Sequence, residues 1–259
     1  RGRETARATM TTDPFPKEHA VRVETAHGVF TVGGTAKGSG MIEPNMATMI
    51  GMLTTDARVP PSLLRRALVE SARDTFNAIT VDGECSTNDT LFALASGSSA
   101  VEIDEPTYAL LVDAFLAVSR PLAIDIVRGG EGATKLIEVA VHDARTRDDA
   151  RQVARTIANS PLVKTAVHGA DPNWGRIVAA AGRSGVQFDI QRATVRVGGV
   201  LLFEQGLPRD EAAPRAAEHM TGKEVRIDVH LGTGGGVAAW IWTCDLTAEY
   251  VRINGEYRT

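Results

Sequence analysis

Apolar residues follow two different periods along the chain, and together these periods predict a mixture of helices and strands. Where apolar residues recur every three or four positions, one face of a helix is expected to be buried. Leu64, Leu68 and Phe76 belong to such a stripe. Thr146, followed three residues later by Asp149, has the form of a capping box that opens a helix. Helices are predicted over 62–79, 108–118, 146–159, 174–181 and 210–220.

Strands are predicted where apolar and polar residues alternate, because successive side chains of a strand point to opposite faces. The first such segment is a strand pair that turns near His27-Gly28, and the last ends at the turn dipeptide Asn254-Gly255. Strands are expected over 21–32, 136–141, 186–190, 194–203, 224–231, 237–244 and 250–253. Long helices beside hairpins favour an α+β layered sandwich over a regular series of βαβ units.

Composition narrows the functional classes. The chain has 259 residues, 43% of them hydrophobic and 23% charged, which is typical of a soluble globular protein with one large or two modest domains. A formal net charge of -4 provides no basic surface for nucleic acid, and no apolar run is long enough to span a membrane. Cys85 and Cys244 are too few for a disulfide framework and suit a reducing cytoplasm. Arg1 is not an initiator methionine, so we expect the sequence to begin partway through a longer polypeptide.

Neither a metal nor a cofactor is expected. The histidines are scattered without the spacing of metal ligands. The glycine run 232–236 lacks the lysine of a phosphate-binding loop and is predicted to form a turn or bulge. For 171–176 we favour a structural role, a proline-led helix start with Trp174 packed in the core.

The segment 31–55 contains the candidate chemistry. It holds four glycines, Gly33, Gly34, Gly38 and Gly40, with Lys37 among them and the sequence Met-Ala-Thr ending at Thr48 beyond them. Glycines allow backbone angles that other residues resist, so this loop could place a hydroxyl against its own preceding carbonyl. The alternative is a turn whose threonine caps or lines a strand, and local chemistry alone favours that alternative.

The segment KGSGMIEPNMATMIGMLTTDA, residues 37–57, resembles the cleavage-site signature of the ornithine acetyltransferases. Other segments resemble further motifs of that family in the same order, from Thr11 to the last residue. They are MTTDPFPK (10–17), VDGECSTNDT (81–90), GGEGATK (129–135), GADPNWGR (169–176) and DLTAEYVRINGEYRT (245–259).

The resemblance implies an α+β sandwich of the ornithine acetyltransferase and self-processing aminopeptidase type. It implies that the backbone breaks between Ala47 and Thr48, so that 1–47 is the C-terminal part of an α chain and 48–259 a β chain. The two chains are expected to form one intertwined catalytic unit with a small C-terminal subdomain, to assemble as α2β2, and to act in the cytoplasm.

The implied reaction is a ping-pong transfer of an acetyl group from N2-acetylornithine to glutamate through an acetyl-Thr48 ester. After cleavage, Thr48 has a free α-amine with a reference pKa of about 7.7–8, which can take the proton of its hydroxyl. The family resemblance carries substrate contacts over to Thr11, Lys37, Thr48, Glu131, Asn254 and Thr259. The donors that stabilise the oxyanion are expected upstream of Arg1.

For two of these residues the side-chain type gives a direct chemical reason for substrate binding. Lys37 can pair with an α-carboxylate and Glu131 with the ornithine ammonium. As alternatives, Glu131 is a solvated loop acid, Lys37 a surface lysine, and Thr12 serves in place of Thr11. At the level of function, one alternative is a self-processing aminopeptidase or amidohydrolase of the same fold, which passes the acyl group to water. The other is a catalytically silent binding protein.

Overall fold

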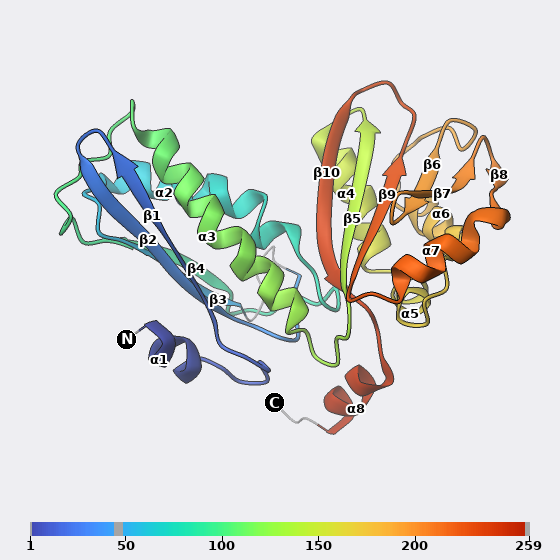
Figure 1. Ribbon diagram of the computed structural model, residues 1–259, viewed down its shortest axis with the longest axis horizontal. Coiled ribbons are helices and arrows are strands. Elements are labelled where there is room, and N and C mark those ends of the chain that lie inside the picture. Colours follow the sequence, from blue (N-terminus) through green and yellow to red (C-terminus); the bar gives the residue numbers. More distant parts are fainter. Residues whose placement is uncertain (1, 44–48, 257–259) are drawn as a thin grey trace. The chain divides into compact units, whose positions relative to one another are not determined.

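The computed structural model describes residues 2–43 and 49–256. They belong to two compact units, Arg1–Gly130 and Glu131–Thr259, and each unit has a sheet with helices packed against it (Figure 1). The predicted α+β class is therefore confirmed. No helix within the described ranges is both long and apolar enough to cross a membrane.

The N-terminal unit is built around a sheet with the strand order β1-β2-β3-β4. The pairs β1–β2 and β2–β3 are antiparallel, whereas β3 and β4 run parallel. Its helices are α1 (Gly2–Ala8), α2 (Pro61–Arg73), the 3-10 helix η1 (Phe76–Ala78) and α3 (Tyr108–Arg128). Its strands are β1 (Lys17–Thr25), β2 (Gly28–Lys37), β3 (Ile50–Thr55) and β4 (Thr90–Ala95).

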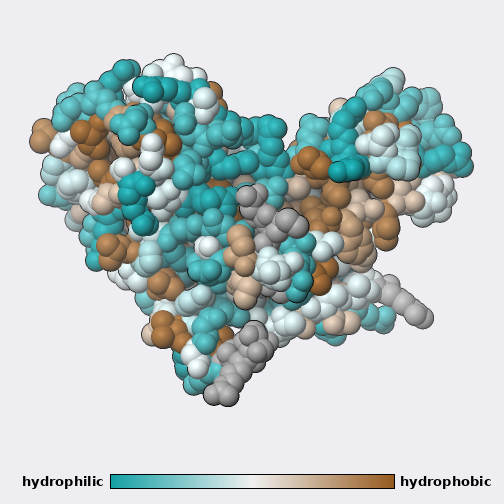
Figure 2. Space-filling view, turned by 180° about the vertical axis from the view of Figure 1, so that it is seen from behind, coloured by the Kyte–Doolittle hydropathy of each residue, from teal (hydrophilic) through white to brown (hydrophobic). Residues whose placement is uncertain are grey.

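Helix α3 packs on β1 and β2, and the packing is close enough to require a glycine. A Cβ atom on Gly34 would lie 2.8 Å from Leu53 and 2.9 Å from Val118. The predicted strand pair turning near His27-Gly28 is the β1–β2 hairpin, in which Thr25 pairs with Gly28. The opposite face of this sheet is less covered: Leu94 on β4 is 55% exposed, and apolar surface is visible on this unit in Figure 2.

The C-terminal unit contains a sheet with the order β10-β5-β9-β6-β7-β8. Helix α4 packs on β5 and β10. Thr146 caps α4 by accepting a hydrogen bond of 3.1 Å from the N–H of Asp149, as the capping box predicts. The helices are α4 (Arg147–Ala158), α5 (Pro161–His168), α6 (Trp174–Gly182), η2 (Asp210–Ala212), α7 (Ala213–Met220) and α8 (Ala248–Glu256). The strands are β5 (Leu136–Ala144), β6 (Thr194–Val197), β7 (Val200–Glu204), β8 (Leu207–Pro208), β9 (Glu224–His230) and β10 (Val237–Cys244).

Two predicted strands are wrong. The segment 250–253, with the expected turn at Asn254-Gly255, lies inside helix α8. Arg252 stabilises this helix through ion pairs with Glu249 and Glu256, which lie on the same helix face. The segment 186–190 forms no strand, because no neighbouring strand pairs with it. The predicted strand 194–203 is a hairpin, β6 and β7, that turns at Gly198-Gly199.

Helix α6 begins at Trp174 as predicted, but Pro172 does not lead it. The capping residue is Asn173, whose side chain accepts a hydrogen bond of 3.1 Å from the N–H of Arg176. Trp174 is half-buried rather than part of the core. It stacks on Phe203 with 5.1 Å between ring centroids, and its indole N–H donates to Asp210.

Candidate active site

The connection between β2 and β3 carries the predicted nucleophile. The two strands pair so that Lys37, the last residue of β2, lies opposite Ile50, the first of β3. Both arms of the connection therefore leave the sheet at the same edge, with Lys37 on one side and the chain that leads back to Thr48 on the other. Ala47 and Thr48, the predicted cleavage site, lie outside the described residues, as does Thr259.

The segment 80–90 binds the upstream arm of this connection. The Asp82 carboxylate accepts hydrogen bonds from the N–H groups of Met41, at 2.7 Å, and Ile42, at 3.0 Å. The thiol of Cys85 donates to the carbonyl of Glu43 at 3.0 Å. These contacts fix the last described residues before the gap at 44–48.

The same segment also binds the downstream arm. The N–H of Met49 donates to Oδ1 of Asp89, and the N–H of Thr90 donates to the Met49 carbonyl at 2.9 Å. The second contact begins the parallel ladder between β3 and β4, in which Ile50 lies opposite Thr90. The family-like motif at 81–90 is therefore a brace that holds the connection between β2 and β3, which carries the predicted nucleophile, from both sides.

Lys37 is a buried lysine, with 8% of its surface exposed. Two other buried lysines have partners: Lys17 is bonded to Asp13 at 2.5 Å, and Lys164 donates to Thr243 at 3.1 Å. Within the described residues no acceptor bonds to the Lys37 ammonium, although its charge acts on Asp89. A buried ammonium is stabilised by a counter-charge, so Lys37 is suited to an anionic ligand.

Thr11 is exposed, and it is tied to the Lys37 region through Asp13. Oδ2 of Asp13 accepts from the N–H of Thr11 at 3.2 Å, and Oδ1 accepts from the N–H of Gly38 at 2.8 Å and from Lys17. Burial acts to raise the pKa of Asp13, but the Gly38 N–H and the Lys17 ammonium hold it below its usual range. Asp13 was not singled out from the sequence, because the N–H of Gly38 that ties it to the Lys37 region lies 25 positions along the chain.

Glu131 and Asn254, both predicted from the family resemblance, contact each other. The side-chain amide of Asn254 donates to Oε2 of Glu131 at 2.9 Å and to the carbonyl of Tyr250 at 3.0 Å. Glu131 is half-buried, and Gly132 beside it has a φ of 69°. A Cβ atom on Gly132 would lie 2.5 Å from the N of Tyr250, so only glycine allows α8 to pack this closely.

Asp245 joins two of the family-like motifs in the C-terminal unit, 129–135 and 245–259. Its fully buried carboxylate accepts from the N–H groups of Thr134 and Lys135, at 2.8 and 2.9 Å, and from the Thr134 hydroxyl. It also bonds to Nδ1 of His168 at 2.8 Å. Burial acts to raise the pKa of Asp245, but these hydrogen bonds lower it below the usual range. This role is not predictable from the sequence, because a single acid before a helix resembles a surface residue.

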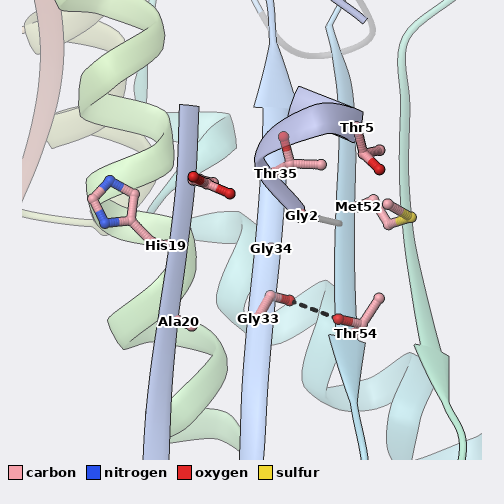
Figure 3. A pocket seen from close by; sticks show the side chains of 10 residues that line it. Gly2, Thr5, His19, Ala20, Gly33, Gly34, Thr35, Met52 and Thr54 are labelled. Atoms are coloured by element: carbon pink, nitrogen blue, oxygen red, sulfur yellow. Dashed lines mark hydrogen bonds between the residues drawn. The ribbon is translucent and has the colours of Figure 1, made fainter. Parts of the chain in front are cut away.

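A separate pocket of about 370 Å³ lies on the sheet of the N-terminal unit. Figure 3 shows helix α1 crossing over β2 and β3, with Gly33 and Gly34 beneath it and the hydroxyl of Thr54 bonded to the Gly33 carbonyl. Small side chains and glycines form most of its lining, and none of the predicted site residues that the structure describes belongs to it. The pocket is therefore distinct from the candidate active site.

The fold and the site define an α+β protein in which a glycine-rich strand connection is braced from both sides next to a buried lysine. The chain belongs to the ArgJ family, whose model matches residues 2–259. The resemblance drawn from the motifs is therefore confirmed.

Relatives of this family cover the whole chain. The arginine biosynthesis bifunctional protein ArgJ of Dehalococcoides mccartyi is 48% identical over 265 residues, and that of Symbiobacterium thermophilum is 49% identical over 265 residues. All of this chain aligns with each of them, and it spans 64% and 65% of their lengths. The crystal structure of ArgJ from Bacillus halodurans superposes with a TM-score of 0.75 at 39% identity, covering 80% of this chain and 98% of that one.

Proposed function

We propose that the protein is a glutamate N-acetyltransferase of arginine biosynthesis, which transfers the acetyl group of N2-acetylornithine to glutamate on Thr48. The observation that carries this proposal is the buried Lys37, which lies opposite Ile50 at the root of the Thr48 connection. Both substrates are α-amino acids, and a buried cation beside the nucleophile can bind the α-carboxylate of each in turn.

Maturation comes first. The hydroxyl of Thr48 attacks the carbonyl carbon of Ala47, the peptide bond breaks, and water hydrolyses the resulting ester. The products are a carboxylate on Ala47 and a free α-amine on Thr48. That amine can then act as the base for its own hydroxyl, since its reference pKa of about 7.7–8 lies close to neutral pH.

Transfer follows in two half-reactions. Thr48 attacks the acetyl carbonyl of N2-acetylornithine, and ornithine leaves with the proton on its amine. The amine of glutamate then attacks the acetyl-Thr48 ester, which releases N-acetylglutamate and restores the hydroxyl. The chain's own residues bind and orient the substrates, and no step needs a metal or a cofactor.

The remaining proposed substrate contacts are of two kinds, one charged and the others neutral. Glu131 binds the ornithine ammonium, and the hydrogen bond from Asn254 supports this role because it fixes the carboxylate through one oxygen and leaves the other for a ligand. Thr11, held through its N–H by Asp13, and Thr259 provide neutral polar contacts.

The mature protein has an α chain ending at Ala47 and a β chain starting at Thr48, assembles as α2β2, and acts in the cytoplasm. The sheet of the N-terminal unit supports the intertwined arrangement, because its strands β2 and β3 lie on either side of this cleavage site in sequence and are paired.

The test is intact mass spectrometry of the complete protein after brief incubation with N2-acetylornithine. We expect two chains, and on the second an added acetyl group that disappears when glutamate is supplied. Loss of the acetyl group to water at the same rate without glutamate would favour the self-processing aminopeptidase. A single uncut chain that gains no acetyl group would favour the silent binding protein. A parallel sample with acetyl-CoA in place of N2-acetylornithine tests whether the protein also accepts this second acetyl donor. The word bifunctional in the relatives' names motivates this test.

A further inference from the structure

Helix α8 is held in the C-terminal unit by polar contacts rather than by buried side chains. All of its residues are described, and none of them is buried. It nevertheless lies directly against the segment 131–135, because a Cβ atom on Gly132 would be 2.5 Å from the N of Tyr250. Elements with few buried apolar contacts have low local stability, so the hydrogen bonds of α8 determine how it lies on this segment.

The hydroxyl of Thr247, the residue before α8, makes two of these hydrogen bonds. It donates to the carbonyl of Gly132 at 2.8 Å, across 115 positions in the chain. It also accepts a hydrogen bond of 3.4 Å from the N–H of Tyr250, as a threonine that caps the start of a helix does. Thr247 is itself buried. One buried hydroxyl therefore connects the start of α8 to the residue that follows Glu131.

Two further contacts join the same parts of the chain, one on each side of Thr247. Before it, Asp245 accepts a hydrogen bond of 2.8 Å from the N–H of Thr134. Beyond it, Asn254 on α8 donates to Oε2 of Glu131 at 2.9 Å. The reach of Asn254 to this carboxylate depends on how α8 lies on the segment 131–135, and Thr247 joins the two at the start of the helix.

The position of the Glu131 carboxylate matters for the contact proposed for it. Glu131 is half-buried, and the proposed ligand is the side-chain ammonium of N2-acetylornithine. A hydrogen bond between an ammonium and a carboxylate has a length of about 2.7–2.9 Å, so a displacement of about 1 Å would lose most of the contact. A donor substrate without a side-chain ammonium would not be affected in this way.

We infer that Thr247 is a positioning residue that sets the selectivity for donor substrates with a side-chain ammonium, and this inference rests on the proposed function. Thr247 acts through Glu131. Its hydroxyl keeps α8 where Asn254 reaches the Glu131 carboxylate. Without the hydroxyl, the Gly132 carbonyl and the Tyr250 N–H lose the group that joins them, and the carboxylate is no longer held at one place.

The test is steady-state kinetics of the complete enzyme with glutamate and two donors. The donors are N2-acetylornithine and N2-acetylnorvaline, which has the same carbon chain and no side-chain amine. Thr247→Val keeps the shape of the side chain and removes the hydroxyl. We expect it to raise the KM for N2-acetylornithine about tenfold, the effect of one lost hydrogen bond, and to change kcat less than about twofold. The KM for N2-acetylnorvaline should stay the same.

A double-mutant cycle with Glu131→Gln tests whether the effect of Thr247 passes through Glu131. Residues that act through one contact have effects that do not add. We expect Thr247→Val to raise the KM for N2-acetylornithine no further when Glu131 is already replaced by glutamine. Additive effects would overturn the positioning role. Thr247→Ser, which retains the hydroxyl, should have the wild-type KM for both donors.

Thr233→Val is the matched control. The Thr233 hydroxyl also donates to a carbonyl far along the chain, that of Asp143 at 2.6 Å, and accepts from a nearby N–H, that of Gly235 at 3.3 Å. Thr233 lies in the glycine run 232–236, which is outside the predicted site. We expect its replacement to lower the thermal stability about as much as Thr247→Val does and to leave both KM values unchanged. Equal KM increases in the two variants would contradict the inference.

The outcomes separate the two proposals. A wild-type enzyme that transfers no acetyl group from N2-acetylornithine to glutamate overturns the proposed function. With an active wild type, the inference alone is overturned if Thr247→Val keeps the wild-type KM, or if its KM rises equally for both donors. Should Thr247→Val not fold, as judged by thermal unfolding, Thr247→Ser decides. A wild-type KM supports the role of the hydroxyl, and an increase of about tenfold overturns it.

Discussion

The side chain of Asn254 donates a hydrogen bond of 2.9 Å to the carboxylate of Glu131, across a separation of 123 positions in the chain. Asn254 lies on α8, and Glu131 begins the C-terminal unit. Gly132 allows the contact, since any side chain there would collide with Tyr250. The last helix is thus fastened to the residue proposed to bind the ornithine ammonium.

We predict that Glu131→Gln raises the KM for N2-acetylornithine roughly tenfold or more. A hydrogen bond to a charged group contributes about 1.5–3 kcal/mol, and the neutral amide loses most of this attraction for an ammonium. Steady-state kinetics and thermal unfolding should be measured on the same samples. Glu211→Gln, on an exposed residue of η2, is the control. Parallel losses of stability and activity in the Glu131 variant would make Glu131 a structural residue instead.

The two buried lysines of the N-terminal unit should respond in opposite ways to replacement by methionine. Lys17→Met leaves the buried carboxylate of Asp13 without its counter-charge, which costs about 3–5 kcal/mol of unfolding free energy. Lys37→Met removes a cation to which no described acceptor is hydrogen-bonded, so stability should hold or rise while the KM for both substrates increases. The unfolding free energy in urea and the steady-state KM should be measured for both variants. A Lys37 variant that unfolds as easily as the Lys17 variant would contradict a ligand-binding role.

Processing gives a third prediction. Thr48→Ala should yield one uncut chain, because the methyl group cannot attack the preceding carbonyl. In the wild type, N-terminal sequencing should find a second chain that begins with threonine at position 48. A mature protein with no threonine start would refute the cleavage position.

The fourth prediction concerns pH. The folded-state pKa of Asp245 is lowered, so its contribution to stability is complete above its unfolded value of about 3.9 and is lost as the pH falls through the folded value. We expect Asp245→Asn to lose about 1.5–3 kcal/mol at neutral pH, the value of hydrogen bonds to a charged group. Chemical unfolding should show that the difference in unfolding free energy between wild type and variant becomes smaller below about pH 4. A gap that stays constant down to acidic pH would contradict this account.

The fifth prediction tests the end of the chain. Removing Arg258 and Thr259 should leave self-cleavage intact, since the brace at 80–90 is far away in sequence. Acetyl transfer should fall sharply if Thr259 contacts the substrate as proposed. A gel and a transfer assay on the same preparation separate the two effects, and Asn254→Ala tests the preceding helix. Full transfer by the truncated enzyme would remove Thr259 from the site.

The sequence predicted the periodic elements well and the short ones poorly. Helix α4 was predicted with its cap because Thr146 and Asp149 act locally. The segment 250–253 was predicted as a strand because four residues are too few to distinguish the period of a strand from that of a helix. In the structure it is helical, and ion pairs from Arg252 stabilise the helix. A short segment therefore takes the structure that its neighbours stabilise.

The candidate site was predictable only in part, for a related reason. Lys37, Glu131 and Asn254 were named because family motifs surround them, and the structure adds the contact between the last two. Asp13, Asp89 and Asp245 were missed. Each is an isolated acid in sequence, and its importance comes from backbone N–H groups that folding brings to it.

The pairing of β2 with β3 affects whether the protein can refold after it has been cleaved. In the uncut chain, the ladder from Val32↔Thr55 to Lys37↔Ile50 joins two parts of one molecule, so it forms at a rate independent of concentration. Once the bond before Thr48 has broken, the same ladder joins two molecules, and refolding becomes a second-order process. The precursor would then act as its own intramolecular chaperone. The mature enzyme would persist because it unfolds slowly, and after denaturation its recovery would depend on dilution.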